Sequence, residues 1–200
     1  MHREFEPAPP TPDYQPPTSG EELLARYAKG ERYFQHALLS GEELNGVDLR
    51  GVNLEDADME DIQLRGADLS GAWLRSANLE ESDLTGAKLV NANLRGAYFH
   101  GAVFDEVDMT DASAPSGNGR AVSLKNATLV EAHLRFINLI AADLQNADFR
   151  GAVLEGCRMP RANLRGANLK GAKLADADLE GAQLQGADLS DTEFDPARKG

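Results

Sequence analysis

Residues 67–96 read ADLSGAWLRSANLEESDLTGAKLVNANLRG, and the spacing of the leucines in this stretch decides the fold. Leucine recurs at every fifth position, and the residue two positions earlier is nearly always small. The series of large apolar residues at every fifth position extends back to Phe34 and on to Met109, and it resumes from Leu124 to Phe194. We call the large apolar position of each repeat i, so the small residue occupies position i−2.

A five-residue period fits neither a straight α-helix nor a flat β-strand. An α-helix turns about 100° per residue, so the leucines would spread over every face. A flat strand alternates between two faces, so an odd period would send successive leucines to opposite sides. The pattern instead predicts a chain that bends once per repeat and keeps i−2 and i on one inner side. Stacked coils of such a chain would pair their backbones and bury a continuous Ala/Leu interior.

The outward positions of the repeat are polar or turn-forming. Gly, Asn or Asp at i+2 suits tight turns, and Asn or Asp at i−1 points outward. Units such as Ala67-Asp68-Leu69-Ser70-Gly71 and Ala167-Asn168-Leu169-Lys170-Gly171 resemble the bacterial pentapeptide-repeat family over residues 32–195. The resemblance implies an all-β fold, a right-handed quadrilateral β-helix with four repeats per coil. At the usual strand spacing, about eight coils would make a rod roughly 40 Å long.

The N-terminal region is expected to hold a tail and a cap. Residues 1–18 contain most of the nine prolines and little to bury, which predicts a disordered or extended tail. A capping-box pattern at Ser19 and Glu22 opens a short helix over residues 19–30, which would cover the open edge of the first coil. The segment EELLARYAKGERYF, residues 21–34, also resembles the leader that precedes the repeats in cyanobacterial pentapeptide proteins.

The β-helix is expected over residues 31–195, followed by a tail over residues 196–200. The tail is too short to cover a coil. Either Phe194 plugs the stack while Pro196 and charged residues blunt the edge, or this end pairs with another copy. The first interpretation, and with it a monomer, is favoured; a dimer through the C-terminal coil is the alternative.

The pattern breaks at residues 110–121, TDASAPSGNGRA, where position i falls on Ala114 and Gly119. The break spans whole repeats, so the register on either side is preserved. Either the coil continues through degenerate repeats, or about ten residues loop out. The succession of Pro, Ser, Gly and Asn favours the loop.

A loop at this place would gather an apolar patch at mid-rod, because several outward positions nearby hold large apolar groups. Val130 would then lie over His100, and Arg135 over Asp105. The candidate partner-binding residues are Tyr98, His100, Val103, Ser116, Asn118, Arg120, Val130, Arg135, Phe136 and Ile140. The alternative is that Phe136 and Ile140 only pack under the folded-back loop. Trp73 and Val153 are further outward apolar residues away from this patch.

Bulk properties limit the partners. A net charge of −13 and a pI near 4.7 argue against direct nucleic-acid binding, which uses basic surfaces. The single cysteine, Cys157, occupies an inward i−2 position and is interpreted as a small core residue. Neither a membrane-spanning run nor a secretory signal is apparent, so no membrane association and a cytoplasmic location are expected.

Sequence motifs for catalysis are missing. The four histidines are scattered, and no metal-binding, nucleophile or phosphate-binding motif is present. A filled β-helix presents convex faces, whereas catalysis needs a concave pocket with converging titratable groups. Outward rows of Asp and Asn are interspersed with Arg and Lys, which indicates solvated ladders. We therefore expect no enzyme, no cofactor and no metal site.

Two functions compete at this point. The leading hypothesis is a non-enzymatic scaffold, a rigid rod whose faces bind an unidentified protein partner. The alternative, implied by the gyrase-binding branch of the family, is an acidic DNA mimic that inhibits or protects DNA gyrase or another topoisomerase. That branch commonly carries Phe at position i and a C-terminal dimerisation helix, whereas this chain is dominated by Leu. The candidate acidic face is Glu55, Asp56, Asp58, Glu60, Asp61, Glu80, Glu81 and Asp83.

Overall fold

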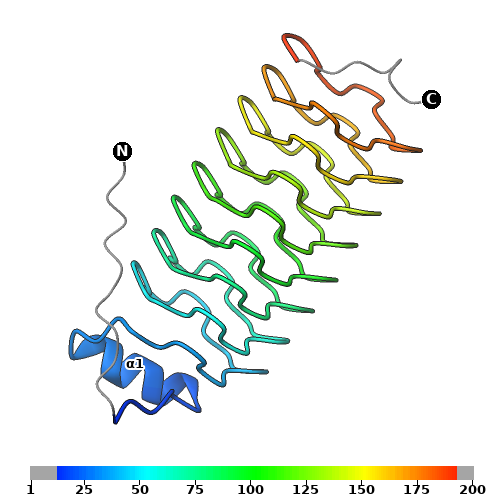
Figure 1. The fold of residues 1–200 in the computed structure, drawn as a ribbon. Helices are drawn as coiled ribbons and strands as arrows, with labels where there is room; N and C mark the ends of the chain where they lie inside the picture. The colour runs from blue at the N-terminus through cyan, green and yellow to red at the C-terminus, as the bar shows by residue number, and fades with distance from the viewer. Residues whose placement is uncertain (1–12, 193–200) are drawn as a thin grey trace.

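The computed structural model describes residues 13–192, and most of them wind into a stack of coils (Figure 1). Parallel β-bridges join residues twenty apart, from Tyr33↔Asn53 to Asn168↔Asp188. One coil therefore consists of four repeats, and residues 33–192 form eight coils, numbered 1 to 8 along the chain. The bridges are isolated, one per repeat, so the described residues contain no strand longer than a single bridge. Their one helix is α1, Gly20–Ala28.

Four repeats per coil give the rod four faces, which we name by the outward residues that form the bridges. Face 1 carries Tyr33, Asn53, Trp73, Asn93, Ser113, His133, Val153 and Lys173. Face 2 carries Leu38, Asp58, Asn78, Tyr98, Asn118, Asn138, Arg158 and Asp178. Face 3 carries Glu43, Gln63, Asp83, Val103, Ser123, Asp143, Asn163 and Gln183. Face 4 carries Asp48, Asp68, Lys88, Asp108, Thr128, Asp148, Asn168 and Asp188. Residues at i+2 form the edges between faces.

Each repeat follows one backbone pattern. In the repeat centred on Leu54, the N–H groups of Leu54 and Asp56 donate to the carbonyls of Trp73 (2.8 Å) and Arg75 (2.9 Å) in the next coil. The N–H of Ala57 donates back to the carbonyl of Leu54 at 3.2 Å and closes a four-residue turn. Asp56, the third residue of that turn, has φ 54°, the left-handed value that type II turns need. This requirement explains the frequent Gly, Asn and Asp at i+2.

The interior is the column of residues that the five-residue pattern predicts. Positions i and i−2 are buried almost without exception from Phe34 to Leu179, and Cys157 is among them. Ser82 is a polar exception, and its hydroxyl donates to the carbonyl of Leu79 at 2.6 Å. The β-helical solenoid with an Ala/Leu core is therefore confirmed.

The loop favoured for residues 110–121 is wrong, because the coil continues through them. Bridges Tyr98↔Asn118 and Asn118↔Asn138 keep the twenty-residue register across this segment. The ring of Phe99 fills the space that a leucine at Gly119 would occupy: a Cβ added there would lie 2.1 Å from the ring. Pro115 occupies i+1, a turn position that suits proline and whose N–H makes no backbone–backbone hydrogen bond between coils.

The stacking expected from the looped arrangement is wrong for the same reason. The 20-residue register places Val130 next to Thr110 on face 4 and not over His100. Arg135 lies over Pro115, since the carbonyl of Arg135 accepts from the N–H of Ser116 at 2.9 Å, and not over Asp105. Phe136 and Ile140 consequently have no folded-back loop to cover them.

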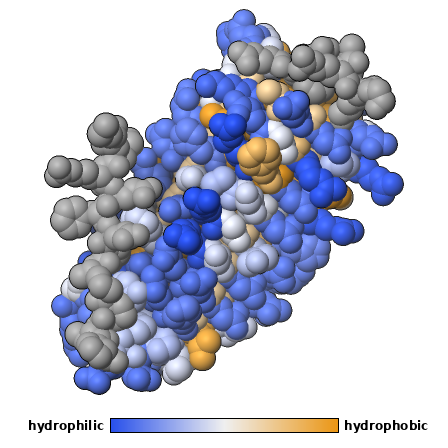
Figure 2. Space-filling view, viewed as in Figure 1, coloured by the Kyte–Doolittle hydropathy of each residue, from blue (hydrophilic) through white to orange (hydrophobic). Residues whose placement is uncertain are grey.

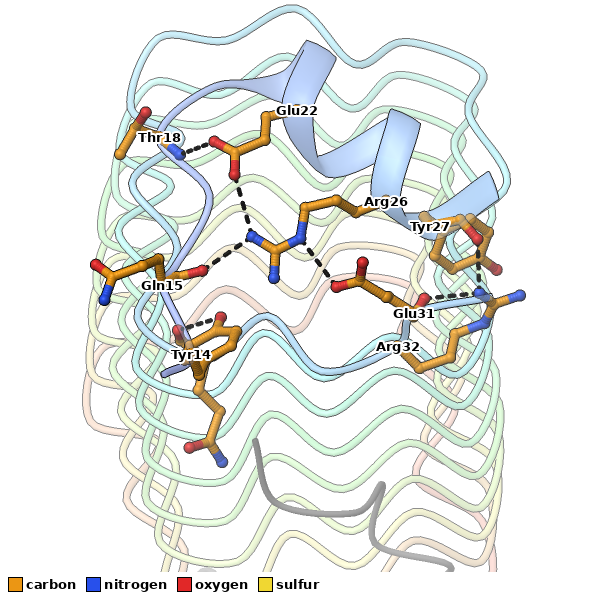
Figure 3. A network of polar contacts seen from close by, with 9 residues as sticks. Tyr14, Gln15, Thr18, Glu22, Arg26, Tyr27, Glu31 and Arg32 are labelled. Carbon is orange, nitrogen blue, oxygen red and sulfur yellow. Dashed lines mark hydrogen bonds and ion pairs between the residues drawn. The ribbon is translucent and has the colours of Figure 1, made fainter. Parts of the chain in front are cut away.

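The N-terminal end of the stack is covered by α1 and by the chain that precedes it (Figures 1 and 3). Ser19 caps α1 by accepting from the N–H of Glu22 at 3.2 Å, and Leu23 is fully buried. Residues 13–18, the described part of the predicted disordered or extended tail, run along coil 1. The carbonyl of Pro17 accepts from the N–H of Leu38 at 2.9 Å, so this segment bonds to the outer edge of coil 1.

The opposite end is less enclosed. Leu184 and Leu189 in coil 8 are only partly buried, whereas Leu164 and Leu169 one coil earlier are buried. The predicted plug at Phe194, the tail at 196–200 and the tail at residues 1–12 lie outside the described residues.

Candidate functional site

Face 2 collects most of the predicted partner-binding residues, although through a different stacking from the expected one. Tyr98, His100, Asn118, Arg120 and Ile140 lie on face 2, and Ser116 and Phe136 lie on the edge where the chain enters it. The structure separates the remaining three candidates: Val103 lies on face 3, Val130 on face 4 and Arg135 on face 1.

Exposed large apolar side chains also gather there. Leu38, Tyr98 and Phe136 are 53%, 48% and 61% exposed, and all three lie on face 2 or its entering edge. Figure 2 shows one side of the rod, where hydrophobic residues are scattered among hydrophilic ones. Face 2 is distinguished from the other faces because it and its entering edge carry all three exposed large apolar side chains of the described residues.

Phe136 combines exposure with an unfavourable backbone. Its φ of 58° is left-handed, where bulky residues are rare and cost roughly 1 kcal/mol or more. The ring lies against the next coil, since a Cβ added at Gly156 would come within 2.6 Å of it. The guanidinium of Arg135 lies 5.9 Å from the ring centroid and pairs with Glu155 at 2.6 Å. Every repeat needs a left-handed residue at i+2, so what distinguishes Phe136 is the exposed aromatic side chain at that position and not its φ.

The predicted acidic cluster is largely brought together on face 2. Asp56, Asp58, Glu60, Asp61, Glu80 and Glu81 lie on this face or its edges in coils 2 and 3. No Lys or Arg shares that part of the face. Glu55 and Asp83 lie elsewhere and are paired, Glu55 with Arg75 at 3.7 Å and Asp83 with Arg65 at 2.6 Å. Face 2 thus has an acidic N-terminal half and a Tyr98–Phe136 patch beyond it.

A groove on face 1 is a feature that sequence analysis missed. It has a volume of about 860 Å³ and follows the edge between faces 4 and 1. We call it the Trp73 groove; it is lined by Gly51, Gly71, Ala72, Trp73, Asn91, Ala92, Asn93, Asp111, Ser113 and His133. Its origin is a ladder with two large residues, Trp73 and His133, separated by the small Asn93 and Ser113. Comparing positions twenty residues apart would have revealed it.

Face 4 carries paired charges and no concentration of one sign. Arg50 and Arg150 each contact the carboxylate two residues earlier at 2.6 Å. The hydrogen bond from Arg50 lowers the pKa of Asp48 to about 2, and that from Arg150 lowers the pKa of Asp148. These pairs are solvent-exposed, so they describe a stabilised surface and not a reactive site.

Within residues 13–192, no three His, Cys, Asp or Glu side chains come together in a way that could hold a metal ion. The described part of the chain also contains no helix with the length and apolar character needed to cross a membrane. The described residues offer binding surfaces: an amphipathic face 2, with a hollow lined by Asp58, Glu80 and Tyr98, and the Trp73 groove on face 1.

Stacked four-repeat coils with a filled core define the class, a β-helical repeat solenoid. The chain belongs to the pentapeptide-repeat family: the family model for pentapeptide repeats matches eight copies over residues 33–113, 120–156 and 162–195. The unmatched stretch 114–119 coincides with the degenerate repeats at Ala114 and Gly119.

Several experimental structures resemble the chain. HetL, a pentapeptide repeat protein involved in heterocyst differentiation regulation from the cyanobacterium Nostoc sp. strain PCC 7120, is 32% identical over 88% of this chain and 94% of HetL, with a TM-score of 0.36. A thylakoid-lumen pentapeptide repeat protein from Arabidopsis thaliana is 35% identical over 46% of this chain and 65% of its own, with a TM-score of 0.46. QnrB1, a plasmid-mediated fluoroquinolone resistance protein, is 17% identical over 78% of this chain and 91% of its own, with a TM-score of 0.45. No curated protein sequence matches the chain.

Proposed function

We propose that the protein is a non-enzymatic scaffold that binds another protein through face 2. The observation that carries the proposal is that Leu38, Tyr98 and Phe136, the exposed large apolar side chains of the described residues, share this face and its edge. Apolar groups of this size on an otherwise polar surface mark interaction sites, and aromatic residues commonly dominate their energetics.

The shape of the rod supports the same proposal. Parallel bridges at every repeat make an extended surface without flexible connections, which suits a scaffold. The proposal includes the finer expectations of a right-handed coil, a monomer and a cytoplasmic location, and the burial of the lone Cys157 agrees with a reducing compartment.

A paired-variant capture experiment tests this function. Tyr98→Asp with Phe136→Asp should abolish recovery of the partner from a lysate of the source cell, because two charges would enter the centre of the contact. Val130→Asp with Val90→Asp introduces the same two charges on face 4 and should leave recovery unchanged. Equal recovery with both proteins would contradict binding through face 2, provided that their melting temperatures agree.

The acidic half of face 2 supports a second candidate, a DNA mimic that binds a topoisomerase. Asp58, Glu60 and Glu80 project from adjacent coils without a basic neighbour on this face, and such a row of charges can occupy a groove that normally receives phosphates.

A gyrase supercoiling assay tests the second candidate. Inhibition, or protection from a fluoroquinolone, should disappear with Asp58→Lys/Glu60→Lys/Glu80→Lys. A matched reversal of three carboxylates on face 3 and its edge, Glu43→Lys/Glu106→Lys/Asp143→Lys, should retain it. Gyrase activity that is unchanged by wild-type protein at micromolar concentration would remove this candidate and leave the scaffold.

A further inference from the structure

Glycines leave one border of the Trp73 groove without side chains. A Cβ added at Gly51 or Gly71 would meet no atom within 4 Å, so the glycines leave the edge free of side chains. Ala72 and Ala92 are buried beneath it, and Trp73 stands at one side as the only tryptophan of the chain. A ligand in this channel would lie along the rod against an indole.

The chemistry of the lining suits a proline-rich segment in an extended conformation. Such a segment presents pyrrolidine rings and carbonyl acceptors but few N–H donors. The groove offers the complement, an indole surface with donors from the Trp73 Nε1–H and from the side-chain amides of Asn91 and Asn93. Aromatic-lined grooves are the usual receptors for polyproline II segments because the ligand is already ordered before it binds.

The path of the described chain leads toward this groove. The carbonyl of Pro17 accepts from Leu38 on face 2, whereas Tyr14 donates to the carbonyl of Gln35 at 2.9 Å and packs its ring edge-on against Tyr33, 5.5 Å away. Followed backward, the chain therefore runs along coil 1 from face 2 to face 1. Tyr33 belongs to the same ladder as Trp73, two coils away.

The length and composition of the segment before Tyr14 also match the Trp73 groove. Two coils correspond to about 10 Å along the rod. The preceding segment, Pro7-Ala8-Pro9-Pro10-Thr11-Pro12, would span about 19 Å at roughly 3.1 Å per residue if it bound as polyproline II, enough to pass Trp73 and reach about Ser113. Four of its six residues are proline.

The geometry points to the Trp73 groove as a binding site for a proline-rich segment, with residues 1–12 of this same chain as its occupant. Tethering supplies an effective concentration on the order of millimolar, so a segment with a dissociation constant of about 100 μM in free form would fill the groove most of the time. The site lies on face 1 and is independent of the binding proposed for face 2.

Tryptophan fluorescence can test the proposal, because Trp73 is the only tryptophan in the sequence and lies in the groove. The full chain should show a more blue-shifted emission and slower quenching by acrylamide than a variant that lacks residues 2–12 but retains Tyr14. Pro7→Ala/Pro9→Ala/Pro10→Ala/Pro12→Ala should resemble the truncated chain. Identical emission and quenching in the full and truncated proteins would overturn the proposal.

A synthetic peptide of residues 1–12 provides a second, independent test of the proposal. Titrated into the truncated chain in a calorimeter, it should bind, and binding should weaken at least tenfold with Trp73→Ala while Val103→Ala, on face 3, should leave it unchanged. A peptide that binds equally well to the Trp73→Ala chain would refute the assigned site. Protection of Trp73 that increases with protein concentration would refute the intramolecular occupant, since a tail from a second copy would then fill the groove.

Discussion

At the scale of single residues, Phe99 and Gly119 show how the core tolerates an irregular repeat. Phe99 is larger than the usual leucine, and Gly119, twenty residues later, is smaller. The ring of Phe99 lies so close to Gly119 and Gly117 that added Cβ atoms would be 2.1 Å and 3.0 Å from it. The two positions therefore share one volume across neighbouring coils.

We expect this pair to be strongly coupled. Gly119→Leu should cost about 3 kcal/mol of unfolding free energy by overpacking, and Phe99→Leu about 1–2 kcal/mol by leaving a cavity. The double variant recreates the regular repeat and should come within about 1 kcal/mol of wild type. Urea denaturation of the three proteins measures the coupling, and costs that simply add would refute the shared volume.

A second residue-scale prediction concerns pH. The Arg150 hydrogen bond holds the pKa of Asp148 below its usual value. A depressed carboxyl pKa contributes stability that is present above the unfolded pKa of about 3.9 and is lost as the pH falls through the folded pKa. Arg150→Ala should therefore lower the melting temperature slightly at pH 6, and the difference should shrink as the pH falls below the unfolded pKa of about 3.9.

Arg95→Ala is the control for this titration, because Arg95 makes no ion pair within residues 13–192. Its effect should not depend on pH over the same range. A pH-independent effect of Arg150→Ala would contradict the assignment.

At the scale of elements, the N-terminal cap is held by one arginine (Figure 3). Arg26 of α1 donates to Glu22 at 3.1 Å, to Glu31 at 2.9 Å and to the carbonyl of Gln15 at 2.9 Å. Its guanidinium also lies 5.6 Å from the ring centroid of Tyr14. The helix, the turn after it and the segment before it thus meet at a single side chain.

Arg26→Met should loosen this end without unfolding the rod. Loss of these charged hydrogen bonds should reduce local stability by about 1–3 kcal/mol, because repeat proteins open from their ends. Hydrogen exchange should accelerate at the amide of Leu38 and remain unchanged at the amide of Leu89 in the middle of the stack. Uniform acceleration along the chain would contradict a local cap.

Some elements of the structure can be predicted from the sequence alone and others cannot, for physical reasons. The position of each buried leucine follows from the five-residue period alone, because one backbone turn per repeat determines which side chains face inward. The continuous coil at residues 110–121 did not follow, because Pro115 and Gly119 favour loops locally and their accommodation depends on Phe99 one coil away. The Trp73 groove was missed likewise, since it exists only when Trp73 is compared with residues twenty and forty positions later.

At the scale of the whole molecule, the coil register decides which surface residues share a face. Deleting residues 123–127 removes one whole repeat and preserves the inward pattern, so the protein should still fold. The deletion turns the following coils back by one face and moves Phe136 to the edge between faces 4 and 1. Deleting residues 143–147 also removes one repeat but leaves Tyr98 and Phe136 on face 2.

The two deletions should therefore differ in partner capture and not in fold. Circular dichroism and melting should be similar for both, whereas the 123–127 deletion should lose the partner and the 143–147 deletion should retain it. A four-residue deletion, 123–126, should disrupt the second half of the rod, because it turns leucines outward. If both five-residue deletions recovered the partner, binding would not require Tyr98 and Phe136 to lie on the same side of the rod.

The uniform bridges between residues twenty apart also have a mechanical meaning. If the two ends of the chain were pulled in opposite directions, the coils would carry the load in series, and a terminal coil would peel away first because it has a neighbour on only one side. Each rupture would free twenty residues, roughly 60 Å of new contour length after the lost coil height is subtracted. A force–extension trace would then show a regular sawtooth whose step is set by the perimeter of the rod.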